Sequence, residues 1–384
     1  MINKMSGRIR ISSMNRIFCL GIFIAIGFHR ILTCRPGGTV FALSASNSRR
    51  KDTVAGLKKM PERRALPETI LVGYATRCSE KVIQAVREGV NVVIWSFVEM
   101  TVASDDESTS EGKGAKCISF FDISCAKKMI SQLDSEGYDD TVHLVSFGGW
   151  NGPHLPNELS AENMYKAWKE LIGETFHGVD WDLEGHNRLD NPTNVFSIDC
   201  LENMGRFSEL AKQDGFIVGM APPQSYLDIE ESRFTRYVNL TDPTRGWHDD
   251  FHYFGHNAYA YLLSKYGDSI DFVSVQFYES YSRAGLEVFH NNVAPATYLQ
   301  NYVKDLVDNK AESFFVDFDQ DPSLNHSSRM VPFPLSKLVF GFANGWGADD
   351  DEKVCYFDPE EIAVAYNALK NSDQAPRGFM YWVM

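Results

Sequence analysis

Three acidic side chains recur at alternate positions in the middle of the chain. Asp180, Asp182 and Glu184 are separated by apolar residues in the run FHGVDWDLEG, residues 176–185. Alternate side chains share one face of a β-strand, so neighbouring carboxyl groups would lie roughly 6–7 Å apart. Like charges this close raise the pKa of at least one of them, which keeps a carboxylic acid able to donate a proton near neutral pH. The spacing predicts acid–base catalysis, and the structural alternative is a solvated face on an edge strand.

The elements around this strand predict an α/β fold. From residue 67 onward, apolar β-type runs alternate with longer helical stretches, which is typical of parallel βαβ units. The expected strands are 70–74, 90–97, 141–147, the acidic run 176–185, 216–221, 270–278, 337–342 and 378–383. Helices are expected near 79–89, 121–136, 159–174, 199–213, 297–309 and 358–371. Eight such strands predict a (β/α)8 TIM barrel.

Two stretches depart from this alternation. The chain stops at Met384, within or just after the eighth strand, so the last helix of a complete barrel is missing. Either residues 51–66 cover the seam between the first and last strands, or the sequence is truncated. Residues 240–262 read as an insertion in which His248, His252 and His256 recur every four residues. On a helix they could hold a metal, but without further ligands a polar face or loop is favoured, and we expect no metal or cofactor.

Composition limits the class of partner, and the first residues indicate the cellular localisation. A formal net charge of −14 argues against nucleic acid or an anionic membrane surface as partner. Arginines precede the apolar run 17–28, which has the length of a signal-peptide core and is short for a bilayer span. We therefore expect a signal peptide or signal anchor at 1–45, a linker at 46–66 and one catalytic domain at 67–384. The product would be secreted, or membrane-anchored if the apolar run is not cleaved.

Cysteines and sequons fit an oxidising compartment. Two of the seven cysteines lie within the expected signal, and of the other five Cys117 and Cys125 are the favoured pair, because they close a short loop. The triplets Asn239-Leu-Thr241 and Asn325-His-Ser327 would accept glycans in a secreted protein.

The acidic strand resembles the D-G-x-D-x-D-x-E motif on the fourth barrel strand of family 18 glycoside hydrolases, the chitinase family. Every fixed position of residues 177–184 matches except the first, where His177 replaces Asp. Three further segments resemble family motifs in the family's order, covering roughly residues 69–384. They are Ser146-Phe147-Gly148-Gly149 (S-x-G-G), Met220-Ala221-Pro222 (M-A-P), and Gln276-Phe277-Tyr278 (Q-F-Y) of the branch that includes class III plant chitinases and related fungal and bacterial enzymes.

The resemblance implies a role for each site residue. Glu184 is the general acid and then the base, Asp182 orients the substrate acetamido group, and Asp180 shares a proton with Asp182. Tyr278 donates a hydrogen bond to the acetamido carbonyl region. The family's Asp at position 177 lies deep in the barrel, where a histidine could still pair with Asp180 and change the pKa of the acid. The residues expected to line the sugar site are Tyr74, Phe97, Gly148, Met220, Gln276 and Trp382.

The implied activity is cleavage of β-1,4-linked N-acetylglucosamine polymers (chitin) with retention of configuration, assisted by the substrate's own acetamido group. We expect a monomeric, endo-acting chitinase. Three alternatives stay open: a non-catalytic or weakly active chitin-binding lectin of the same fold, an endo-β-N-acetylglucosaminidase that cleaves N-glycan cores, and a membrane-anchored structural protein.

Overall fold

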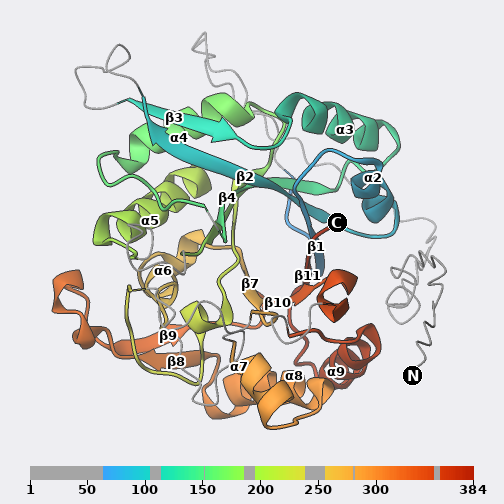
Figure 1. The fold of residues 1–384 in the computed structure, drawn as a ribbon, viewed down its shortest axis with the longest axis vertical. Helices are drawn as coiled ribbons and strands as arrows, with labels where there is room; N and C mark the ends of the chain where they lie inside the picture. Colours follow the sequence, from blue (N-terminus) through green and yellow to red (C-terminus); the bar gives the residue numbers. More distant parts are fainter. Residues whose placement is uncertain are drawn as a thin grey trace, which may run out of the picture.

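The strands of the protein close into a barrel. The computed structural model describes residues 64–103, 114–150, 152–185, 195–237, 256–279, 282–349 and 355–384. The parallel strands are β1 (Ile70–Ala75), β2 (Val92–Val102), β4 (Val142–Gly149), β5 (Gly178–Leu183), β6 (Ile217–Met220), β7 (Phe272–Gln276), β10 (Leu338–Ala343) and β11 (Gly378–Trp382). Because β1 pairs in parallel with both β2 and β11, the sheet has no free edge along this ring (Figure 1). The predicted (β/α)8 fold is confirmed.

Helices surround the ring of strands (Figure 1). The longer ones are α2 (Glu80–Arg87), α3 (Ile123–Ser135), α4 (Ala161–Ile172), α5 (Ile198–Gln213), α6 (Ala260–Tyr266), α8 (Pro295–Lys304) and α9 (Pro359–Asn371). Asp122, Ser160 and Ser197 start α3, α4 and α5, and each side chain accepts a backbone N–H of the first turn. None of the described helices has the length and apolar character needed to cross a bilayer.

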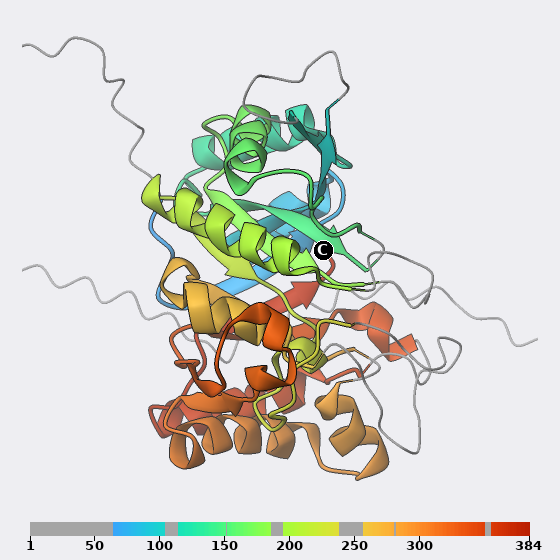
Figure 2. The same cartoon turned by 90° about the vertical axis from the view of Figure 1, so that its left-hand side faces the viewer.

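Shorter elements occupy the connections. They are α7 (Arg283–Gly285), the 3-10 turns η3 (Gln224–Leu227), η4 (Gly267–Ser269), η7 (Phe318–Gln320), η8 (Pro322–Leu324) and η9 (Gly345–Asp349), and the π turns η5 (Leu286–His290) and η6 (Asp305–Asn309). The sequence did not predict β3 (Ala115–Ser119), which pairs antiparallel with β2, or the hairpin of β8 (Ser313–Val316) and β9 (Arg329–Pro332). In Figure 2 the last part of the chain, orange to red, lies mostly in the lower part of the molecule.

Alternation along the strands creates two cores. Strand side chains that point outward, such as Trp181, pack against buried helix residues such as Trp168 of α4 and Phe207 of α5. Side chains that point into the barrel form a smaller cluster that includes Val72, Tyr74 and Phe272. A sheet buried on both faces needs apolar residues at nearly every position. For this reason, polar residues inside the barrel stand out as candidates for function.

Residues near the start of the domain contact the seam of the barrel. The Arg377 guanidinium donates to the carbonyl oxygen of Pro67 at 2.9 Å, and Leu66 packs against the inner core. Arg64 pairs with Asp134 of α3 at 2.6 Å. Residues 64–66 thus pack on the barrel although they fall in the predicted linker. The expected signal segment, 1–45, lies outside the described residues.

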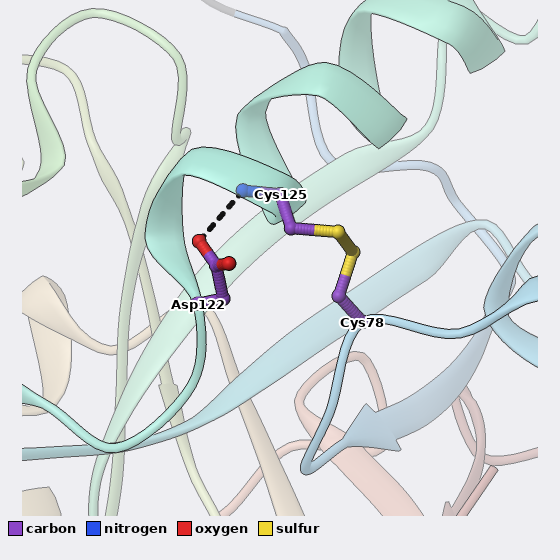
Figure 3. The surroundings of a disulfide bond; sticks show 3 residues. All are labelled: Cys78, Asp122 and Cys125. Carbon is purple, nitrogen blue, oxygen red and sulfur yellow. Dashed lines mark hydrogen bonds between the residues drawn. A yellow bond between two sulfur atoms is a disulfide. The ribbon is translucent and has the colours of Figure 1, made fainter.

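One disulfide differs from the predicted pairing. Cys78, in the connection after β1, is bonded to Cys125 in the first turn of α3, with a Cα–Cα distance of 6.1 Å (Figure 3). Cys117 is a free cysteine on β3, where it lies opposite Met100 of β2. The prediction of a Cys117–Cys125 bond was wrong, because closeness in sequence does not decide the pairing. The fold instead brings the β1–α2 connection, which carries Cys78, next to Cys125 at the start of α3.

Candidate active site

Two acidic residues of β5 and a third directly after it point into the barrel at its carboxyl end. Asp180, Asp182 and Glu184 are 0%, 3% and 6% exposed. Between them, Trp181 points outward and its indole N–H donates to Ser208 of α5 at 2.9 Å. The alternative of a solvated edge strand is wrong, because β5 lies between β4 and β6.

Asp180 lies on the inner face next to two hydroxyl groups. Tyr74 and Ser146 each donate to its Oδ2 at 2.7 Å. Its Oδ1 has no hydrogen-bond partner among the described residues. Burial raises the pKa of Asp180 to about 6, and the two hydroxyl donors act against this rise. Near neutral pH the carboxyl group is therefore poised to exchange a proton.

Asp182 and Glu184 behave as one titrating pair. Burial is the largest cause that raises the pKa of each carboxyl; next come the charge of Glu184 for Asp182 and that of Glu279 for Glu184. Gln276 donates to Asp182 Oδ1 at 2.8 Å, which fixes the pair from the side of β7. Because burial and neighbouring negative charge disfavour the ionised form of both carboxyls, this cluster favours the retention of a proton.

Aromatic side chains surround these carboxyl groups. Tyr278 is buried; its pKa is raised first by burial and then by the charges of Asp182, Glu279 and Glu184. The rings of Trp382 and Phe97 stack at 5.7 Å between centroids, and Tyr74 meets Trp382 edge-on at 5.3 Å. A register shift at the end of β2 places Phe97 against the inner core. Phe97, Tyr278 and Trp382 thus gather where the sequence predicts a sugar site.

Two residues predicted to line the sugar site, Gly148 and Met220, have structural roles instead. Gly148 has φ of +108°, and a Cβ there would lie 2.3 Å from the carbonyl oxygen of Asp182, so it lets β4 approach the acidic strand. The prediction that Met220 lines the sugar site was wrong, because its side chain belongs to the outer core beneath the helices. Alternation on β6 sends Met220 outward and its neighbour Ala221 inward.

His177 is likewise not where the resemblance predicts. It lies three positions before Asp180 and so has the opposite orientation on the strand. Its Nδ1 accepts the backbone N–H of His143 at 2.8 Å, and the two rings lie 5.8 Å apart. The pairing of His177 with Asp180 is therefore wrong. The change from Asp to His at this position does not enter the carboxyl cluster.

Two residues of the site were not predicted from the sequence. Glu279 follows Tyr278 directly, is half-buried, and has a pKa raised to about 7 by burial. Tyr226, in η3, is buried with a pKa raised by burial and then by the charges of Glu184 and Glu279. The acid next to the Q-F-Y segment was a usable signal for Glu279, whereas nothing in the periodicity marks Tyr226.

Glu279→Gln should move the alkaline limb of the pH–rate profile toward lower pH by about one unit. The charge of Glu279 raises the pKa of Glu184, so removing it lets the acid lose its proton at lower pH. The measurement is kcat/KM against pH on a chromogenic oligosaccharide. Glu158→Gln, an exposed change, is the control and should leave the profile in place. An unchanged limb for Glu279→Gln, or a shift to higher pH, would contradict this role.

The histidine repeat does not form a metal centre in the described part of the chain. His248 and His252 lie outside it. His256 is buried, and burial lowers its pKa to about 4. Across the described residues, no three His, Cys, Asp or Glu side chains are grouped to hold a metal ion.

Comparison with known proteins identifies the fold. No family model matches the chain, and no curated protein matches it. Among solved structures, a family GH18 chitinase from Chromobacterium violaceum matches with a TM-score of 0.51 and 16% sequence identity, over 84% of this chain and 80% of that chain. The C-terminal domain of Legionella pneumophila ChiA matches with a TM-score of 0.48 and 15% identity, over 82% of this chain and 92% of that chain. A fungal endo-β-N-acetylglucosaminidase from glycosyl hydrolase family 18 matches with a TM-score of 0.45 and 13% identity, over 83% and 90%. The first of these matches shows that the chain has the fold of a family 18 glycoside hydrolase, as the motifs predict.

Proposed function

We propose that the protein is a retaining glycoside hydrolase of family 18 that cleaves β-1,4-linked N-acetylglucosamine polymers by an endo mode. The observation that carries the proposal is the buried pair of Asp182 and Glu184 at the carboxyl ends of the barrel strands, where barrel enzymes keep their chemistry. The phenol of Tyr278 and the ring of Trp382 belong to the inner core around the same pair.

In this proposal Glu184 protonates the glycosidic oxygen of the bond that breaks. The substrate's acetamido carbonyl attacks C1 from the opposite face, so the sugar supplies its own nucleophile. Asp182 accepts the acetamido N–H and balances the positive charge of the oxazolinium ion, and Tyr278 donates to the acetamido oxygen. Water then attacks C1 and opens the oxazolinium ring, while Glu184 removes a proton from that water. Asp180, held by Tyr74 and Ser146, exchanges a proton with Asp182.

Substrate class follows from these roles. A nucleophile carried by the substrate requires an N-acetyl group at C2, and stacking on Trp382 requires a pyranose face without axial substituents. Trp150, exposed at the end of β4, offers a second apolar surface at the same end of the barrel. No group in this scheme depends on a metal or an organic cofactor.

The test is turnover of a fluorogenic chitobioside and of defined chitin oligosaccharides, with the anomer of the first product read by proton NMR. We expect the β-anomer and internal cleavage of the longer oligomers. Binding without turnover would favour a lectin. Release of N-glycans that leaves one N-acetylglucosamine on the asparagine of a glycoprotein, with no action on chitin oligomers, would favour the N-glycan core activity. If the protein neither binds nor cleaves any of these substrates, the proposed carbohydrate site is rejected.

The proposal includes the localisation of the protein. We infer secretion from the apolar segment 17–28 and from the exposed position of Asn325 in its sequon. The mature N-terminus, read by sequencing the product exported from a eukaryotic host, separates a cleaved signal from a retained anchor. Mass analysis after glycosidase treatment tests Asn325.

A further inference from the structure

A histidine outside the acidic motif lies against the backbone of Glu184. His154, in the connection between β4 and α4, is half-buried and stacks on Phe196 at 4.1 Å between ring centroids. Its Nε2 hydrogen bonds to the main-chain carbonyl oxygen of Glu184, and its Nδ1 lies 3.2 Å from the carbonyl oxygen of Val195. The carbonyl of Glu184 is an acceptor, so Nε2 must carry a proton to bond to it; Nδ1 can also donate to Val195 only when both ring nitrogens are protonated.

Glu184 needs such support because the strand ladder ends before it. The last residue of β5 paired with β4 is Leu183, and the last paired with β6 is Trp181. The carbonyl of Leu183 is already held by the hydroxyl of Tyr259 at 2.8 Å. One position further, His154 supplies the donor that a neighbouring strand would otherwise provide.

The segment around Phe196, on which the imidazole of His154 stacks, is itself held by several contacts. Phe196 donates its N–H to the carbonyl of Arg236 at 2.9 Å and accepts from the Arg236 guanidinium at 2.7 Å. Arg236 is in turn paired with Asp321 at 2.7 Å. The imidazole therefore links the backbone of Glu184 to a segment that is anchored independently of β5.

We propose that His154 is a positioning residue that sets the direction of the Glu184 carboxyl through the donor at Nε2, with Phe196 and Val195 holding the ring in place. The inference rests on the proposed function of Glu184 as the acid. A displacement of about 1 Å in a catalytic group can cost about a hundredfold in rate, so a side chain that fixes this backbone acts on kcat more than on KM.

Two conservative variants separate the two nitrogens. The amide nitrogen of Gln can reach the place of Nε2, whereas that of Asn can reach the place of Nδ1. We expect His154→Leu to lower kcat by roughly ten- to a hundredfold with KM nearly unchanged. His154→Gln should recover most of the loss and His154→Asn should not. Equal kcat in the Gln and Asn variants, or full kcat in the Leu variant, would overturn the proposal.

A second histidine provides the matched control. His326 is also half-buried, hydrogen bonds to Ser264 at 2.8 Å, and meets the ring of Phe318 at 4.8 Å. His326→Leu should alter thermal stability without changing kcat per folded molecule. If His154→Leu does not fold, the comparison of Gln with Asn still decides.

Crystal structures of the parent and the variants test the inference apart from activity. In His154→Leu and His154→Asn we expect the main chain of Glu184 to be displaced from Asp182, and in His154→Gln we expect it to stay. An unchanged Glu184 in all three would reject the role of His154. A parent without turnover on any N-acetylglucosamine substrate would instead reject the proposed function and leave this structural result to stand or fall by itself.

Discussion

Glu184→Gln should reduce the hydrolysis of chitin oligosaccharides by about 10³-fold or more, while the protein still binds them. The amide has nearly the same shape as the acid but can neither protonate the leaving oxygen nor take a proton from water. The change also removes an ionisable group from a buried cluster in which the charge of Glu184 raises the pKa of Asp182, so the fold should not suffer. Steady-state rates and calorimetric binding of the same oligomer, measured side by side, give both numbers.

The control for this substitution is Glu174→Gln, an exposed change after α4 that should leave rate and affinity as they are. If Glu184→Gln cleaves as fast as the parent, then Glu184 is not the acid. A loss of binding that equals the loss of rate would place Glu184 in substrate recognition rather than in proton transfer.

Asp182→Asn is expected to lower kcat by about 10²- to 10³-fold, the second largest effect. Asn at this position can still accept from Gln276, which donates to Asp182 at 2.8 Å, so the site keeps its shape. In the proposed mechanism it loses the negative charge that would balance the positive oxazolinium ion. The kinetics on the fluorogenic chitobioside should show the loss in kcat with little change in KM.

Asp140→Asn, an exposed change before β4, is the matched control. Azide or formate should not restore Asp182→Asn, because in this mechanism the nucleophile belongs to the substrate. Recovery of activity with such anions and formation of a glycosyl azide would show that Asp182 is itself the nucleophile and would reject assistance by the acetamido group.

The barrel was predictable because its strands are buried on both faces. Runs such as residues 90–97 and 337–342 need cover on each side, and the helical stretches between them supply it. The inward face of the acidic strand also followed from a period of two residues. Contacts between residues far apart in the sequence were not predictable. Cys78 is bonded to Cys125 because the fold brings the connection after β1 next to the start of α3, and Tyr226 lies near the acidic cluster on a turn that has no sequence periodicity.

Two errors had a common source, the transfer of motif positions without regard to which way each side chain points. His177 is an odd number of residues from Asp180, so alternation alone places it on the other face. Met220 precedes the inward Ala221 by one and must point outward. The alternation of side chains along a strand is therefore sufficient to assign both residues to the outer face of the barrel.

The contacts of residues 64–67 set how far the chain can be shortened from its N-terminal side without loss to the barrel. Arg377 and Pro67 are 310 positions apart, and their hydrogen bond lies at the seam between the first and last barrel strands. Leu66 and Arg64 add an apolar contact and an ion pair at the same end of the domain. A cut at any point up to residue 63 would leave these contacts in place. A cut only a few residues later would remove the ion pair of Arg64, the apolar contact of Leu66 and the hydrogen bond of Pro67, and so would weaken the closure of the barrel that holds the acidic cluster.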